Sequence, residues 1–329
     1  MLNKQQSIFL DIVQSFITKQ NPTLRGAIWP ELYSIARKQA LSGLLGYYLG
    51  RNPDERCPDN LASQLKNDYY RNIAQAVLQE NACESLTGIL NSNGIEHLYF
   101  KGTVIRSFYP IPDLRSIGNI DVLVKPESVS RVCKLLKNEN FELKQYSSKI
   151  CSASKNTVVF IIHPYLSIPV KEDNSLLQDT NFQNASIKNE SLFVLDHSYH
   201  LVYIIGNIAR YITAKRCSIR PVCDVAVFSR ANMDKIDWER VKHLLKECGL
   251  WDFALVVFAC CTECFYQPQY FPDTKTISTD IVYEFVAFLL RNGAPENLYQ
   301  NTQNRFLNIF SKKNPQDKNP IEFYKKIGL

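Results

Sequence analysis

The chain has 329 residues, of which 45% are hydrophobic and 21% are charged, values typical of a globular protein and not of a disordered one. Its formal net charge of +6 is compatible with anionic ligands but too small for a protein that coats nucleic acid. The longest apolar runs, around 158–162 and 255–261, are far shorter than a membrane span. We therefore expect a soluble, cytoplasmic protein, with neither a membrane nor nucleic acid as its partner.

The first twenty residues interrupt their apolar positions with Asp11, Gln14 and Ser15, which indicates an amphipathic helix and not a secretory signal. The ten cysteines are scattered through expected helices, so free buried thiols are favoured over a disulfide framework. Cys261 and Cys264 form a C-x-x-C without a second pair at zinc-finger spacing, which favours a core helix over a metal site.

The segment before residue 95 is expected to be helical. Between 59 and 94 apolar residues recur every four positions, at Leu61, Leu65, Tyr69, Ile73 and Val77. Asp59 is the expected N-cap of this helix, and Asn93-Gly94 supplies its stop.

The period changes after Gly94. Strands are expected at 95–100, 120–124, 141–146 and 157–163, and helical segments at 102–109 and 126–136. Pro110 and Pro112 mark a loop between the first helical segment and the second strand. This order predicts a small mixed α/β sheet.

From about Leu195 the helical period returns. Helices are expected at 195–211, 220–230, 237–248, 251–265, 279–291 and 297–310, followed by a polar tail from Ser311 with one short helix. The expected fold class is α+β, with an N-terminal helical region at 1–94, a small mixed-sheet core at 95–190 and a C-terminal helical domain at 191–329.

The segment 99–125 carries the chemistry. Gly102 follows a strand and opens a helix, so its backbone can approach a ligand closely, and a helix N-terminus favours phosphate. Asp121 begins the next strand among hydrophobic neighbours. A carboxylate at a strand end beside such a turn is a place to hold Mg²⁺ against a triphosphate.

These residues stand as Lys101-Gly102-Thr103, then Arg115, then a strand from 119 to 124 with the sequence N-I-D-V-L-V. The pattern resembles an uncharacterised branch of the polymerase-β-like nucleotidyltransferase superfamily, seen in many bacterial genomes. That branch continues with D-L-H, with D-I-A or D-L-A, and with L-D-W. The counterparts in this chain are Ile161-Ile162-His163, Asp224-Val225-Ala226 and Ile236-Asp237-Trp238, so the resemblance spans residues 20–265.

The resemblance implies a sheet with two carboxylates on one strand and a third on a neighbouring strand, holding two Mg²⁺ ions. The ions clamp a nucleoside triphosphate while an acceptor hydroxyl attacks the α-phosphorus. Carried over, Gly102 and Thr103 would approach the β- and γ-phosphates, and Lys101 and Arg115 would neutralise phosphate. Asp121 would be the catalytic metal ligand, with Asn119 at the other position of that strand.

Two residues depart from the family pattern. Asn119 replaces the first carboxylate, and Ile161 stands at the position of the third. Asn119 still offers a neutral carbonyl oxygen, but two-metal chemistry demands several charged oxygen ligands. Unless Glu127, Glu172 or Asp173 approaches, these residues support at most one weakly bound Mg²⁺, carried mostly by the phosphates of the nucleotide.

Two functions therefore remain open. One is transfer of a nucleoside monophosphate from a nucleoside triphosphate to a hydroxyl on a small molecule, sugar or protein. The other is a catalytically degenerate descendant, a pseudoenzyme that binds a nucleotide or a protein. The two hypotheses differ in whether Asp121 needs a divalent ion. An RNA-binding helical protein is disfavoured, because the sequence has no basic stripe with interleaved aromatic residues.

Each candidate residue also has a structural interpretation. Asp121 can be satisfied by backbone donors, Gly102 can be only a turn residue, and Lys101 and Arg115 can be solvated. We interpret His163, His197 and His200 as packed or surface residues in preference to metal ligands. We interpret Asp224 as a cap or as part of an ion pair within the helical domain. A basic cluster is either a solvated loop or a rim that attracts phosphate, and comprises Arg210, Lys215, Arg216 and Arg220.

Overall fold

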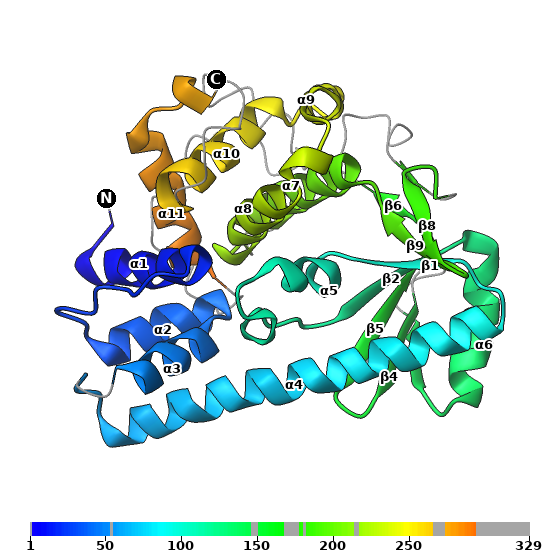
Figure 1. Cartoon of the computed structure of the whole chain (residues 1–329), viewed down its shortest axis with the longest axis horizontal. Coiled ribbons are helices and arrows are strands. Elements are labelled where there is room, and N and C mark those ends of the chain that lie inside the picture. The colour runs from blue at the N-terminus through cyan, green and yellow to red at the C-terminus, as the bar shows by residue number, and fades with distance from the viewer. Residues whose placement is uncertain are drawn as a thin grey trace.

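The computed structural model describes residues 2–52, 55–145, 151–167, 178–179, 182–213, 217–265 and 274–293. Figure 1 shows a mixed sheet at one end of the molecule, N-terminal helices at the other, and C-terminal helices along one side. The predicted α+β class is confirmed.

The N-terminal region is helical, as predicted. Its helices are α1 (Lys4–Thr18), α2 (Trp29–Gln39), α3 (Ser42–Arg51) and α4 (Asp59–Ser92). The predicted N-cap is wrong by one residue, because α4 begins at Asp59 and Pro58 occupies the cap position. Asp59 thus lies in the first turn, where its negative charge complements the helix dipole. Gly94, with φ 61°, follows the end of the helix as expected.

Helix α4 links the two ends of the molecule. Its 34 residues extend over about 50 Å at the usual helical rise. The N-terminal part packs against α3, and near the other end Leu86 and Leu90 lie beneath the sheet (Figure 1). The N-terminal helices and the sheet are therefore attached to one continuous rod.

The sheet has seven strands in the order β3-β4-β5-β2-β1-β9-β8. Its central strands β5, β2 and β1 include a parallel pair, β2 with β5, and an antiparallel pair, β1 with β2. A separate two-stranded sheet joins β6 to β7. The bounds are β1 (His97–Phe100), β2 (Ile120–Val124), β3 (Glu142–Gln145), β4 (Cys151–Lys155), β5 (Val158–His163), β6 (Leu166–Ser167), β7 (Gln178–Asp179), β8 (Ala185–Asn189) and β9 (Leu192–Leu195).

Helical segments follow the central strands β1 and β2. They are α5 (Gly102–Ile105), η1 (Arg106–Phe108), η2 (Pro112–Leu114), η3 (Pro126–Ser128) and α6 (Val129–Asn138). The C-terminal helices are α7 (His197–Thr213), α8 (Arg220–Ala231), η4 (Met233–Lys235), α9 (Trp238–Glu247), α10 (Trp251–Phe265), η5 (Thr274–Thr276) and α11 (Thr279–Asn292). The helices predicted between 195 and 291 are confirmed within a few residues. The helix predicted at 297–310 and the tail lie outside the described residues.

The two faces of β2 belong to different cores. Ile120, Val122 and Val124 pack in a cluster with side chains of α4 and α6. Leu123 belongs to the other cluster, together with Phe100 of β1 and Tyr203 of α7. Because strand residues alternate between faces, Asp121 lies on the side of the sheet that α7 covers.

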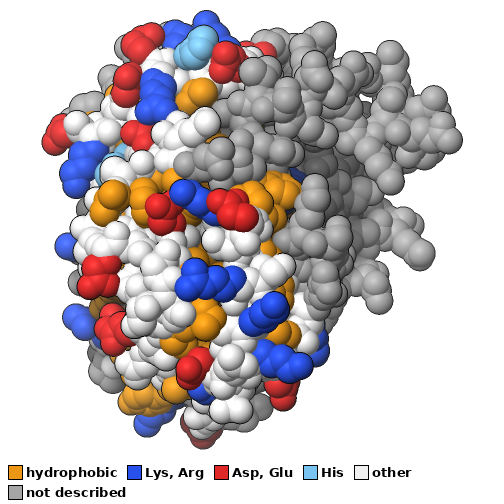
Figure 2. Space-filling model, turned by 90° about the vertical axis from the view of Figure 1, so that its right-hand side faces the viewer, with side chains coloured by type: hydrophobic (Ala, Val, Ile, Leu, Met, Phe, Trp, Pro, Cys, Tyr) orange, Lys and Arg blue, Asp and Glu red, His pale blue; other side chains and the backbone are white. Residues whose placement is uncertain are grey.

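The ten cysteines are all free, as the sequence indicated, and Cys261 and Cys264 are buried within α10. No helix among the described residues is long and apolar enough to cross a membrane. On the face seen in Figure 2, basic and acidic side chains are interspersed with apolar ones over the described surface. The described part of this face therefore presents no broad field of one sign.

Two glycines of α3 provide a test of the packing between α3 and α4. A Cβ at Gly46 would lie 2.2 Å from the carbonyl oxygen of Leu65, whereas nothing lies within 4 Å of a Cβ at Gly50. We expect Gly46→Ala to lower the free energy of unfolding by about 1–3 kcal/mol, because backbone must move. Gly50→Ala should raise it by up to about 1 kcal/mol through helix propensity. Urea denaturation of both variants measures the contrast, and equal effects would contradict this packing.

Candidate functional site

Asp121 is the centre of a polar cluster on the face of the sheet toward α7. Its Oδ1 atom lies 2.8 Å from Lys101 Nζ and 2.8 Å from His163 Nε2. The side chains of Lys101, Asp121 and His163 are only 21%, 15% and 16% exposed, respectively. The predicted Lys101 and Asp121 are thus in direct contact, and His163 joins them as an unpredicted partner.

Neighbouring groups keep this ion pair charged. Burial alone would raise the pKa of Asp121, but the hydrogen bond with His163 and the charge of Lys101 outweigh it and lower that pKa. Burial alone would lower the pKa of Lys101, but Tyr203 and Asp121 outweigh it and raise that pKa. The aspartate is therefore a carboxylate that already has a cation beside it.

Lys101 has an unusual backbone conformation. Its φ is 57° and its ψ is −137°, a combination that residues with a Cβ rarely adopt. This conformation ends β1 and starts α5, and the side chain turns back over the Phe100 ring, with Nζ 5.1 Å from the ring centroid. Local strain at a polar cluster is a frequent sign of a functional site.

Gly102 makes room for the guanidinium group of Arg115. A Cβ at Gly102 would lie 2.3 Å from Arg115 Nη1 and 2.9 Å from Arg115 Cζ. The helix that Gly102 opens has only four residues, so its dipole is small. Thr103 Oγ1 is buried and has no hydrogen-bond partner among the described residues. Of the two predicted residues, Gly102 thus lies against Arg115, and Thr103 follows it in α5.

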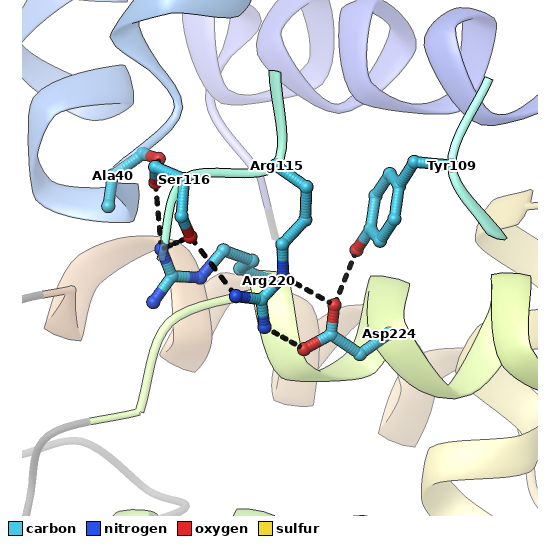
Figure 3. A network of polar contacts seen from close by, with 6 residues as sticks. All are labelled: Ala40, Tyr109, Arg115, Ser116, Arg220 and Asp224. Carbon is cyan, nitrogen blue, oxygen red and sulfur yellow. Dashed lines mark hydrogen bonds and ion pairs between the residues drawn. The ribbon is translucent and has the colours of Figure 1, made fainter. Parts of the chain in front are cut away.

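Arg115 forms a buried ion pair with Asp224 of α8. Its Nε donates to Oδ1 at 3.1 Å and its Nη2 donates to Oδ2 at 2.5 Å, while Tyr109 donates to Oδ1 at 2.7 Å (Figure 3). Nη1 donates to the carbonyl oxygen of Ser116. Asp224 therefore pairs outside the helical domain, contrary to the expectation, because the arginine comes from the loop before β2.

The donor set around Asp121 does not fit a two-ion centre. Ile161 is the residue beside Asp121 in the parallel register of β2 and β5, so the expected third carboxylate position carries an aliphatic side chain. Asn119 is exposed just before β2, and Glu127 is exposed in η3. Glu172 and Asp173 lie outside the described residues. Within the described ranges, no three His, Cys, Asp or Glu side chains are grouped for a metal.

Helix α7 contributes polar residues near this site. Tyr203 and Asn207 are not among the predicted residues, whereas Arg210 belongs to the basic cluster for which a phosphate-attracting rim is one interpretation; Lys215 and Arg216 of that cluster lie outside the described residues. The Tyr203 ring lies 5.5 Å from that of Phe100, and Tyr203 influences the pKa of Lys101. Arg210 Nη2 donates to Asn207 Oδ1 at 2.6 Å. Tyr203, Asn207 and Arg210 are spaced by four and three residues, the spacing of one helix face. This spacing was the signal available in the sequence.

His197 and His200 pack against the Phe228 ring, with centroids 6.0 Å and 5.0 Å away. Burial and the neighbouring His197 lower the pKa of His200 to about 3, and its Nε2 is buried with no hydrogen-bond partner in the described part of the chain. The imidazole of His200 is therefore neutral in the folded protein.

The strain at Lys101 can be separated from its ion pair with two variants. Lys101→Ala and Lys101→Gly both remove the contact with Asp121, but only glycine adopts a positive φ without cost. We expect Lys101→Gly to be the more stable variant by about 1 kcal/mol, despite the larger entropy of its unfolded chain. Chemical denaturation provides the measurement. A more stable alanine variant would show that the backbone at this position is relaxed.

His200 should make the fold sensitive to acid. The pKa of His200 is about 3 in the folded chain against 6.5 for an ordinary histidine, so the unfolded chain binds more protons between these values. Stability from the neutral imidazole is present above pH 6.5 and declines by about 1.4 kcal/mol per pH unit as the pH falls toward 3. In His200→Phe this slope should be reduced by that amount.

The control for this pH profile is His243→Gln, because the His243 side chain is 71% exposed. Its profile should follow that of the wild type. If His200→Phe retained the full acid sensitivity of the wild type, His200 would not be the titrating group.

Comparison with known proteins identifies the family. A model of a family described as uncharacterised nucleotidyltransferase matches residues 26–266. No curated protein and no solved structure gives a significant match. The matched range includes the Lys101–Asp121 cluster and the Arg115–Asp224 pair. The chain therefore belongs to this family of uncharacterised nucleotidyltransferases.

Proposed function

We propose that this chain binds a nucleoside triphosphate beside the Lys101–Asp121 pair and that its site is not built for two-metal catalysis. The observation that carries the proposal is the environment of Asp121, whose Oδ1 is 2.8 Å from both Lys101 Nζ and His163 Nε2. A carboxylate beside an ammonium group has less negative potential to offer a dication.

Family membership supports a nucleotide as the ligand. Two cationic side chains flank the turn at Gly102: Lys101, which is paired with Asp121, and Arg115, which is paired with Asp224. A bound phosphate would share these two cations with the carboxylates. Mg²⁺ would reach the site as part of the substrate, since a nucleoside triphosphate binds the ion through its own phosphates. Asp121 and Asn119 are the residues that such an ion would approach.

A second candidate function is transfer of the nucleoside monophosphate to a hydroxyl acceptor on a small molecule, sugar or protein. It is favoured by the retained Asp121 on the central strand of the sheet. It requires that Lys101 releases Asp121 when the Mg²⁺–nucleotide binds. Phosphoryl chemistry of this kind depends on positioning and charge stabilisation, which one ion supplies less well than two.

Thermal unfolding with each of the four nucleoside triphosphates, with and without Mg²⁺, tests the proposal. A ligand at a hundred times its dissociation constant stabilises the fold by about 2.7 kcal/mol, which raises the Tm by a few degrees. We expect at least one nucleotide to stabilise the wild type without any metal. Lys101→Gln should weaken this effect. If no nucleotide shifts the Tm, the proposal is wrong.

Restored carboxylates distinguish the two functions. In Asn119→Asp/Ile161→Asp two acidic side chains return to the positions at which the family pattern has them. We expect this variant to gain a Mg²⁺-dependent stabilisation by nucleotide that the wild type lacks. Asn119→Asp/Ile161→Asn is the matched control without the third charge. A wild-type chain whose nucleotide binding already requires Mg²⁺ and is lost in Asp121→Ala would favour the transferase.

A further inference from the structure

Arg220, the first residue of α8, has half of its guanidinium group unused. Its Nη1 donates to the carbonyl oxygen and to Oγ of Ser116, at 3.1 Å and 3.0 Å. Its Nε is buried without a hydrogen-bond partner. Figure 3 shows the other terminal nitrogen pointing away from Ser116 and Asp224. The Nε–Nη2 edge, which is the edge that binds an oxyanion with two parallel hydrogen bonds, therefore has no partner within the described residues.

The charges around Arg220 do not balance. Arg115 and Arg220 donate to the same carbonyl oxygen of Ser116. The nearby carboxylate of Asp224 is paired with Arg115 and not with Arg220. No salt bridge to Arg220 occurs in the described part of the chain. Burial and the charge of Arg115 lower the pKa of Arg220, as expected for a guanidinium group without its own anion. A surplus cation beneath the surface costs stability unless a ligand uses it.

The unused edge lies near the nucleotide site proposed above. Gly102 packs so closely against the guanidinium group of Arg115 that a Cβ would not fit between them. Arg115 and Arg220 both donate a hydrogen bond to the carbonyl oxygen of Ser116. Tyr211 of α7 interacts electrostatically with both Lys101 and Arg220. Contacts therefore link Gly102, Arg115 and Arg220 in succession, and among the described residues Arg220 has no carboxylate partner of its own. The N-terminus of α8, which has no side-chain cap, adds its dipole to this region.

We propose that Arg220 binds the terminal phosphates of a nucleoside triphosphate through its Nε–Nη2 edge. The inference rests on the proposed nucleotide binding and assigns to Arg220 the contact with the polyphosphate chain, while Arg115 positions the region through Asp224. The resemblance to the family implies that Arg115 makes the contact between an arginine and the phosphates. The structure shows that three nitrogens of Arg115 are already engaged by protein acceptors.

Binding to ATP, ADP, AMP and inorganic tripolyphosphate should be measured by calorimetry for the full chain and for Arg220→Gln. We expect the dissociation constants of ATP and tripolyphosphate to rise about tenfold or more in the variant, because a charge-assisted bidentate contact is lost. AMP should bind the variant and the wild type equally, since it lacks the terminal phosphates. Arg220→Lys should restore only part of the affinity, because an ammonium group cannot form the bidentate contact.

The stability of the ligand-free variants separates a binding residue from a structural one. Arg220→Gln should leave the Tm unchanged or raise it, because the variant removes an uncompensated charge. Arg115→Gln should lower the Tm strongly, because Asp224 then loses its cation. Arg131→Gln is the control for one lost positive charge, since Arg131 is exposed on α6.

The outcomes are distinguishable. If ATP binds the wild type and Arg220→Gln equally, Arg220 is not a phosphate contact, although the proposed function stands. If the wild type binds tripolyphosphate in an Arg220-dependent way but no nucleotide, the anion site stands and the proposed function fails. If the wild type binds neither, both proposals are wrong.

Discussion

The buried ion pair between Arg115 and Asp224 is the interaction on which the arrangement of the site depends. It joins the loop before β2 to α8 across 109 residues of sequence, with both side chains less than a tenth exposed. Removing one partner of such a pair costs about 3–5 kcal/mol, because the other charge remains without compensation. Tyr109 adds a third group to the same carboxylate. The pair thus fixes the distance between the sheet and the C-terminal helices, and Gly102 and Arg220 take their positions from it.

The site combines retained geometry with altered charge. Strand β2 pairs with β1 on one side and with the parallel neighbour β5 on the other, and the residue beside Asp121 in β5 is Ile161. Lys101 and His163 supply to Asp121 the polar contacts that further ligands would otherwise supply. Asp121 therefore offers a bare metal ion less negative charge than a cluster of carboxylates would, because its one charge is already paired with Lys101.

Local sequence patterns predicted most of the fold, because helices longer than ten residues and strands rich in β-branched residues have strong periods. They failed for β4, whose sequence C-S-A-S-K has no β-branched residue and depends on β3 and β5 for its pairing. They also missed the hairpin of β8 and β9. At the site, the pattern located Lys101, Gly102 and Asp121 close together. It could not reveal that Asp224 would occupy Arg115 or that α7 would face Asp121, because these contacts arise only from tertiary packing.

The length of α4 restricts how the molecule can respond to a ligand. Since this one helix underlies both α3 and the sheet, the N-terminal helices and the sheet form a common platform. The C-terminal helices are tied to the same platform, because Gln39 of α2 donates to the carbonyl oxygen of Leu289 in α11 and accepts from the N–H of Ile219 before α8. We therefore expect a ligand at the sheet to move side chains such as Arg210 more than it moves the helices relative to the sheet.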